Sequence, residues 1–168
     1  MQKILAFYKP NSKNSGHCAS FSQSPKDGTI FASILKQSGW NDEKKIGSFL
    51  ESRNDPLKNV NVKLSQTEAA AILDCLERNR PLSTVHDSDT SLKTIQFTPW
   101  MNKPLNPEDK ATQKGFSFSI SITNKQDSTS PKLAFYIGFS FSEGRLIRSY
   151  LDESLRRSFE SVEVVDSI

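Results

Sequence analysis

The sequence predicts an α+β fold in which a set of antiparallel strands is followed by one helix, and this order occurs twice. The first observation is a change of period. Residues 133–141 alternate large apolar with small side chains, as in a strand with one buried face, whereas apolar side chains in residues 142–159 follow helical spacing. The second observation is that residues 60–64 and 65–79 repeat this order. Each half therefore ends in a strand that leads into a helix.

The third observation is a helix-start signal at each change of period. Ser65 and Glu68 have the spacing of a capping box, in which each side chain binds the other residue's backbone N–H. In the second half Ser142 is the predicted N-cap, followed by Glu143. Aligning Ser65 with Ser142 gives an offset of 77 residues, close to half of the 168. We expect one domain, 1–168, built from two repeats at 1–80 and 81–160, with a short acidic tail at 161–168.

In the first half, alternation and turn residues predict strands at 3–8, 16–23, 45–50 and 60–64 and a helix that stops at Asn79. The segment 29–40 is apolar but has no clear period. Its β-branched and aromatic residues favour a strand, and a helix is the alternative.

In the second half, strands are predicted at 82–87, 92–100, 115–123 and 132–141. Segment 101–113 contains two prolines and several charges, which predicts a long, mobile loop. Each long strand has one apolar face and one face of small polar residues. We therefore expect sheets whose apolar faces pack on the two helices and whose serine- and threonine-rich faces stay open.

Charge is divided between the predicted elements. The net charge is only +3, but residues 1–64 carry +5 and residues 91–141 carry +3. The helix-containing segments 65–90 and 142–168 carry −3 and −2. This division predicts a basic sheet side, which attracts a polyanion, and an acidic helical side. A chance distribution of charges is the alternative.

Nothing in the sequence predicts a membrane partner. No apolar run reaches the roughly 18–20 residues of a membrane span, and the apolar stretch after Lys3 is too short for a signal peptide. Cys18 and Cys75 lie far apart in predicted regular elements, so we expect buried, reduced thiols. These features predict a soluble intracellular protein of the cytoplasm or nucleoid, and they leave an organelle or viral origin open.

Catalytic constellations are missing from the sequence. It has no glycine-rich phosphate loop, no C-x-x-C and no H-E-x-x-H. His17 and Cys18 are adjacent in a predicted strand and would point to opposite faces. His86, near Asp87 and Asp89, is expected in a solvated loop rather than at a metal site. We therefore expect a protein that is not an enzyme, with no catalytic residue, cofactor or metal.

Aromatic and basic side chains alternate in several strands and loops. Single-stranded nucleic acid is bound by this combination, because cations follow the phosphates and aromatic faces stack on unpaired bases. The predicted nucleic-acid-binding residues are Tyr8, Lys9, Lys13, Trp40, Lys44, Lys45, Lys93, Trp100, Lys103 and Lys114. Other readings remain open, because tryptophans at strand ends also serve as core-edge or interface residues and strand lysines also protect sheet edges.

The twofold layout, the S-x-x-E helix start after VNVKLS and the closing LAFYIGFSFS strand with its helix resemble the Whirly-like single-stranded DNA-binding superfamily. That group includes plant Whirly proteins, kinetoplastid guide-RNA-binding proteins and positive-cofactor transcription coactivators. The Whirly KGKAAL motif corresponds here only to KGFSFS at 114–119, which shares Lys and Gly. The resemblance implies two antiparallel sheets packed against two helices, nucleic acid across the sheets and their connecting edges, and association through the helices.

Together these observations predict a sequence-tolerant single-stranded DNA-binding protein, homo-oligomeric through its helices, that acts in DNA replication, recombination, repair or transcription. An RNA-binding protein or RNA chaperone is one alternative, because readout of the 2′-hydroxyl leaves no mark in a sequence. A structural or assembly subunit that binds a protein partner through its sheet face is another.

Overall fold

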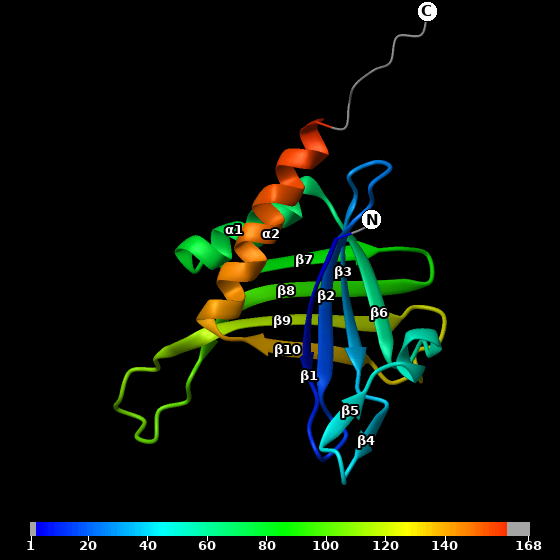
Figure 1. Cartoon of the computed structure of the whole chain (residues 1–168), viewed down its shortest axis with the longest axis vertical. Helices are drawn as coiled ribbons and strands as arrows, with labels where there is room; N and C mark the ends of the chain where they lie inside the picture. The colour runs from blue at the N-terminus through cyan, green and yellow to red at the C-terminus, as the bar shows by residue number, and fades with distance from the viewer. Residues whose placement is uncertain (1–2, 161–168) are drawn as a thin grey trace, which may run out of the picture.

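The computed structural model describes residues 3–160 and contains two four-stranded antiparallel sheets and two helices (Figure 1). In the first half the elements are β1 (Ile4–Lys9), β2 (His17–Gln23), β3 (Ile30–Lys36), β4 (Gly39–Asn41), β5 (Ile46–Ser48), the 3₁₀ helix η1 (Glu51–Asn54), β6 (Asn59–Leu64) and α1 (Gln66–Arg78). In the second half they are β7 (Leu82–Asp87), β8 (Ser91–Met101), β9 (Gln113–Asn124), β10 (Leu133–Phe139) and α2 (Phe141–Glu160). The acidic tail predicted at 161–168 lies outside the described residues.

The first sheet has the strand order β1-β2-β3-β6, and the second has the order β10-β9-β8-β7. Neighbouring strands are antiparallel throughout, and β4 and β5 form a separate hairpin between β3 and η1. The ambiguous segment 29–40 forms β3 and most of β4, so the strand prediction is confirmed. The predicted loop appears between β8 and β9.

The two sheets cross each other at a steep angle, and their apolar faces meet in one core (Figure 1). Phe21 of the first sheet stacks on Phe118 of the second, with ring centroids 5.9 Å apart, and Phe7 meets Phe139 edge to face at 5.1 Å. All four rings are buried because they lie on the apolar side of alternating strands. The predicted α+β class is therefore confirmed, and the sheets pack on each other as well as on the helices.

Both helices begin with a capping box. Ser65 accepts a hydrogen bond from the backbone N–H of Glu68, whose carboxylate accepts one from the N–H of Ser65. The predicted N-cap Ser142 is wrong, because α2 begins at Phe141 and the reciprocal hydrogen bonds join Ser140 and Glu143. The physical reason is that Ser140 has the glutamate three residues ahead that a capping box needs, and Ser142 does not.

Each helix start also binds the first strand of the other half. Glu68 at the start of α1 accepts a hydrogen bond from the Thr84 hydroxyl of β7 at 3.1 Å, and Glu143 at the start of α2 accepts one from Lys9 of β1 at 2.6 Å. The two helices also contact each other and pack beside the first sheet on the inner side of the second. The opposite side of the second sheet makes none of these contacts. Neither described helix is both long and apolar enough to cross a membrane.

Candidate nucleic-acid interface

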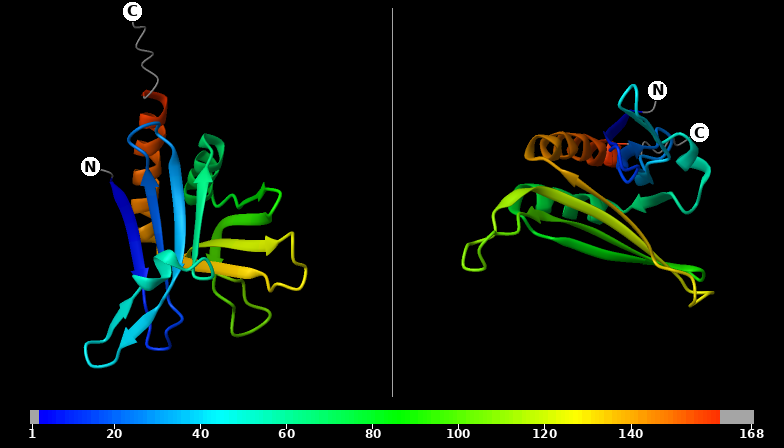
Figure 2. Two further views of the ribbon diagram at one scale, coloured as in Figure 1. Left: turned by 90° about the vertical axis from the view of Figure 1, so that its right-hand side faces the viewer. Right: turned by 90° about the horizontal axis from the view of Figure 1, so that it is seen from below.

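The side of the second sheet that points away from the core is open. In Figure 2, the first sheet and both helices lie on one side of β7–β10, and no described element covers the other. We call this side the outer face. Three adjacent rows across the strands define its centre: Gly138, Ser117 and Thr98; Tyr136, Ser119, Gln96 and Ser83; and Ala134, Ser121, Thr94 and Val85. The sequence-based expectation of an open serine- and threonine-rich face is met here.

Trp100 lies flat on the outer face. The indole extends from β8 towards Gly138 of β10, and a Cβ atom added to Gly138 would lie under 3.0 Å from three indole carbons. The ammonium of Lys114 stands 3.9 Å from the indole centroid, a cation–π contact. Trp100 remains 37% exposed. The structure therefore brings together two predicted site residues, Trp100 and Lys114. The indole packs against Gly138, a contact that the sequence analysis did not predict.

Tyr136 is a second aromatic residue on the outer face, and it was missing from the sequence-based set. It lies on the same strand as Gly138, one row further from Trp100, and is 61% exposed. Because β10 is the edge strand of the second sheet, the His17 ring of the first sheet reaches Tyr136 around this edge, with ring centroids 4.7 Å apart. A signal was present in the sequence, because Tyr136 is the one large residue among Ala134, Gly138 and Ser140 at alternate positions of the predicted strand.

His17 is buried, and its Nε2 has no hydrogen-bond partner among the described residues. Burial lowers the pKa of His17 below its ordinary 6.5, and the nearby charge of Lys36 lowers it further. The imidazole that supports Tyr136 is therefore neutral at pH 7.

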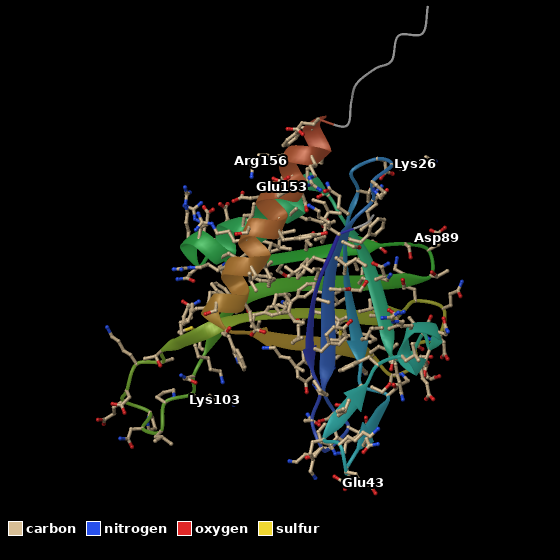
Figure 3. The ribbon with its side chains drawn as sticks, in the orientation of Figure 1. Lys26, Glu43, Asp89, Lys103, Glu153 and Arg156 are labelled. Carbon is tan, nitrogen blue, oxygen red and sulfur yellow. The ribbon has the colours of Figure 1, made fainter. Side chains whose placement is uncertain are left out.

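Three predicted site residues lie in the β4–β5 hairpin, away from Trp100. The Trp40 indole N–H donates to Asp42 at 3.1 Å, and Lys45 forms an ion pair with the same carboxylate at 3.4 Å. Lys44 is exposed in the turn between them. Figure 3 marks this hairpin with Glu43 and shows Lys103 on the β8–β9 loop at a different end of the molecule.

The remaining predicted residues have partners within the fold or lie at its ends. Lys9 pairs with Glu143, and the Tyr8 ring packs edge to face on Phe49 at 5.8 Å. Lys93 points to the inner side of the second sheet and donates to the carbonyl of Asn61 at 3.4 Å. Lys13 is exposed in the β1–β2 turn. The ten predicted residues thus do not form one cluster.

His86 was expected in a solvated loop, and this expectation is wrong. The residue lies in β7, and its Nε2 is 2.7 Å from the Glu68 carboxylate, because the capping box of α1 packs against this strand. Within residues 3–160 no group of three or more His, Cys, Asp or Glu side chains could hold a metal ion. Cys18 and Cys75 are free and buried, as predicted, and burial raises the pKa of each thiol to about 11.

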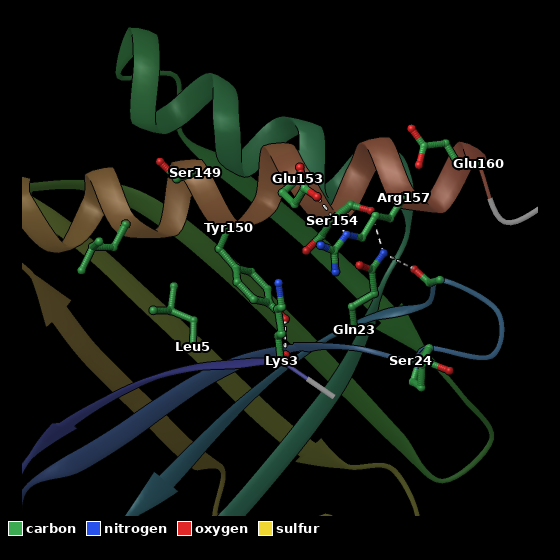
Figure 4. Close-up of a pocket in the computed structure, with 13 residues that line it drawn as sticks. Lys3, Leu5, Gln23, Ser24, Ser149, Tyr150, Glu153, Ser154, Arg157 and Glu160 are labelled. Carbon is green, nitrogen blue, oxygen red and sulfur yellow. Dashed lines mark hydrogen bonds and ion pairs between the residues drawn. The ribbon is translucent and has the colours of Figure 1, made fainter. Parts of the chain in front are cut away.

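A groove of about 670 Å³ separates α2 from the start of β1 and the β2–β3 turn (Figure 4). Several of its polar groups are used inside the fold. The Tyr150 hydroxyl donates to the carbonyl of Lys3 at 2.8 Å, and the Gln23 amide donates to the carbonyls of Ser154 and Gly28 at 2.6 and 2.9 Å. The hydrogen bonds across this groove therefore hold α2 against the first sheet. The outer face remains the stronger candidate site.

Comparison with known proteins places this geometry in a wider group. No family model and no curated protein matches the sequence. Several solved structures share the fold. WHY1 from Arabidopsis thaliana aligns over 99% of this chain and 96% of its own, with a TM-score of 0.64 and 16% identity. The plant transcriptional regulator PBF-2 aligns over 95% and 84%, with a TM-score of 0.63 and 14% identity.

A third match is a guide-RNA-binding protein complex bound to a guide RNA. It aligns over 94% of this chain and 91% of its own, with a TM-score of 0.56 and 16% identity. The crossed sheets, the two helices and their order along the chain are thus shared over nearly the full length of proteins with very different sequences. The chain has the Whirly-like fold.

Proposed function

We propose that the protein binds single-stranded DNA without strong sequence preference and acts in replication, recombination, repair or transcription. The observation that carries this proposal is the outer face, where Trp100 is held flat between Gly138 and Lys114 and remains accessible. Proteins bind single-stranded nucleic acid through this combination, in which a base stacks on the aromatic face and a phosphate pairs with the cation. The matching transcriptional regulator and guide-RNA-binding complex, which share the fold, add support.

RNA is the second candidate ligand, because one structure of the same fold contains a guide RNA. Fluorescence anisotropy with labelled oligo-dT, oligo-U and a duplex, each at two salt concentrations, separates the candidates. We expect oligo-dT to bind most tightly, and its affinity to fall as salt rises because phosphate contacts release counterions. Tighter binding of oligo-U would favour RNA. A preference for duplex, or no binding at low salt, would overturn the proposal.

The β4–β5 hairpin, with Trp40, Lys44 and Lys45, belongs to the proposed site as an outlying contact. Reversing both lysine charges, Lys44→Glu with Lys45→Glu, tests it. If a long strand reaches the hairpin, oligo-dT of 30 nucleotides should lose several-fold in affinity, and oligo-dT of 8 nucleotides should lose less. Unchanged affinity for both lengths would remove the hairpin from the site.

We also propose that the protein assembles as a homo-oligomer through its helices. Three large apolar side chains of α2 are exposed: Phe141, Leu146 and Phe159. Light scattering coupled to size exclusion should give a mass above one chain, and Leu146→Glu should lower it. A monomeric wild-type protein at micromolar concentration would contradict this proposal.

A further inference from the structure

One edge of β1 has no strand beside it. Within residues 3–160, β1 pairs only with β2. The backbone N–H of Gln37 donates to the carbonyl of Gly16 at 2.8 Å, so Gly16 and each second residue after it in β2 form the hydrogen bonds to β3. The β2 residues between them form the hydrogen bonds to β1. By the same alternation, three residues of β1 direct their N–H and C=O groups towards the free edge: Ile4, Ala6 and Tyr8.

The free edge of β1 is exposed, and its backbone groups are unused. Among the described residues, no side chain forms a hydrogen bond with the N–H or C=O of these three residues. The side chains of Ile4 and Tyr8 are 60% and 58% exposed. Natural sheets usually protect such an edge with charged residues, but the one charged residue of β1, Lys9, is bound to Glu143. The edge is therefore open to a further strand.

The groove of Figure 4 lies beside this edge, on the inner side of the first sheet. The Tyr150 hydroxyl holds α2 to the carbonyl of Lys3, where β1 begins. Next to this contact the groove has a volume of about 670 Å³, and its walls include Leu5 of β1 and Leu146 and Ser149 of α2. A strand added to the edge would place every second side chain in this groove, because successive side chains point to opposite faces.

The occupant that fits is an extended segment with both of its faces free. A β1 strand from a second folded copy does not meet this requirement, because its inward Phe7 is already buried in its own core. The charged residues that line the groove are two basic and two acidic: Lys3, Arg157, Glu153 and Glu160. The matching chemistry is therefore a peptide with apolar side chains at alternate positions and no strong net charge.

We propose that β1 and α2 form a docking site for an extended segment of a protein partner, which adds a fifth strand to the first sheet and places alternate apolar side chains in the groove. The free edge supplies main-chain hydrogen bonds, and the groove supplies side-chain selection. This inference goes beyond nucleic-acid binding. Because the first sheet and α2 lie on the side of the second sheet opposite to the outer face, the peptide and oligo-dT bind at the same time.

The probe is a fluorescein-labelled synthetic peptide in which valine and threonine alternate between a terminal lysine and a terminal glutamate. We expect saturable binding by fluorescence anisotropy, and at least ten-fold weaker binding to Ala6→Pro. The proline removes one N–H from the free edge and its ring occupies the place of the added strand, while the β1–β2 hydrogen bonds are kept. Equal affinity of Ala6→Pro and wild type would overturn the inference.

Val85→Pro is the matched control. The N–H of Ser88 donates to the carbonyl of Ser91, so the same alternation directs the N–H of Val85 to the free edge of β7, in the other sheet. This variant carries the same change on an edge strand, and we expect it to bind the probe as wild type does. A loss as large as that of Ala6→Pro would overturn the assignment to β1.

A second measurement uses the wild-type protein and so does not depend on a variant folding. Amide hydrogen exchange is followed by NMR with and without saturating probe. We expect at least ten-fold slower exchange at Ile4, Ala6 and Tyr8, and little change at Phe7, whose N–H already bonds to β2. Unchanged exchange at the three edge amides, no saturable binding of the probe at millimolar concentration, or displacement of the probe by oligo-dT would each overturn the inference.

Discussion

The first half of the chain passes from β6 through Ser65 into α1, and the second passes from β10 through Ser140 into α2. The two capping serines are 75 residues apart, and each capping glutamate binds the first strand of the other half. In each half, the glutamate of the capping box therefore also connects the helix start to the other half. Glu68 and Glu143 thus hold corresponding positions at the helix starts of the two halves.

The outer faces of the two sheets differ. On the first sheet, Cys18 points away from the core and is nevertheless buried, and the neighbouring Tyr8 packs on Phe49 of the segment that links β5 to η1. On the second sheet, no described element covers the corresponding face, and Trp100 and Tyr136 are accessible. The first sheet therefore uses part of its outer face for packing, whereas the second sheet leaves its outer face uncovered by residues 3–160.

The largest effect should come from the core that joins the halves. We propose that residues 3–160 unfold as one unit, because Phe21 and Phe118 come from different sheets and stack on each other. Phe21→Ala and Phe118→Ala should each lower the free energy of unfolding by about 3–5 kcal/mol. The double variant should lose less than the sum, because each ring is the other's partner. Urea denaturation followed by fluorescence and circular dichroism measures this, and two separate transitions would contradict it.

The next largest effect, on nucleic-acid binding, is expected to differ between Gly138 of the second half and Gly39 of the first. Gly138→Ala must displace the Trp100 indole, whereas a Cβ at Gly39 meets only the Ser48 Cβ at 3.9 Å. We expect Gly138→Ala to weaken binding of oligo-dT about ten-fold, near 1.4 kcal/mol, and Gly39→Ala to leave it unchanged. In a Trp40→Phe background, the emission of Trp100 should shift with Gly138→Ala even without ligand. An unshifted spectrum would mean that the position of the Trp100 indole does not depend on Gly138.

A smaller effect is expected at the two helix starts. Ser65→Ala and Ser140→Ala each remove a capping hydrogen bond and should each lower the free energy of unfolding by about 1 kcal/mol. Ser142→Ala is the matched control, because Ser142 lies inside α2 and caps nothing. Thermal denaturation measures all three. A larger loss at Ser142 than at Ser140 would restore the helix start that the sequence suggested.

The sequence was sufficient for the elements because alternation and helical spacing are local patterns. Phe116, Phe118 and Ile120 alternate with serines, so their strand and its buried side could be predicted. The second helix start was misplaced because Ser140 and Ser142 both precede an apolar pattern, and only the hydrogen bonds to Glu143 decide between them. The order of strands within each sheet and the crossing of the sheets come from long-range packing, which no local pattern contains.

The site was harder to predict because it depends on neighbours across strands. Trp100 and Lys114 were predicted separately from their types, but the contact of the indole with Gly138 appears only when β8, β9 and β10 are in register. Lys9 and Lys93 looked equally available in sequence, and both are turned towards partners within the fold. Tyr136 was passed over because one aromatic residue among small ones carries no basic neighbour.

The smallest effect concerns acid stability and compares the capping glutamates. Burial alone would raise the pKa of Glu68, but hydrogen bonds from Ser65, His86 and Thr84 together lower it below its ordinary 4.5. For Glu143, burial likewise opposes the larger combined effect of Lys9 and Ser140, and its pKa is also lowered below 4.5. A lowered pKa means that the folded protein binds the proton less readily than the unfolded chain.

The stabilisation from each carboxylate is therefore complete above pH 4.5 and is lost as the pH falls through the folded-state pKa. Glu68→Gln and Glu143→Gln should each flatten the decline in the free energy of unfolding between pH 5 and 3. Each retains part of its cap, because a glutamine amide can still accept from the N-cap N–H. Glu43→Gln, in the exposed β4–β5 turn, is the control. Urea denaturation across this range measures the slopes. If one variant flattens the profile and the other does not, the two helix starts are equivalent in geometry but not in electrostatics.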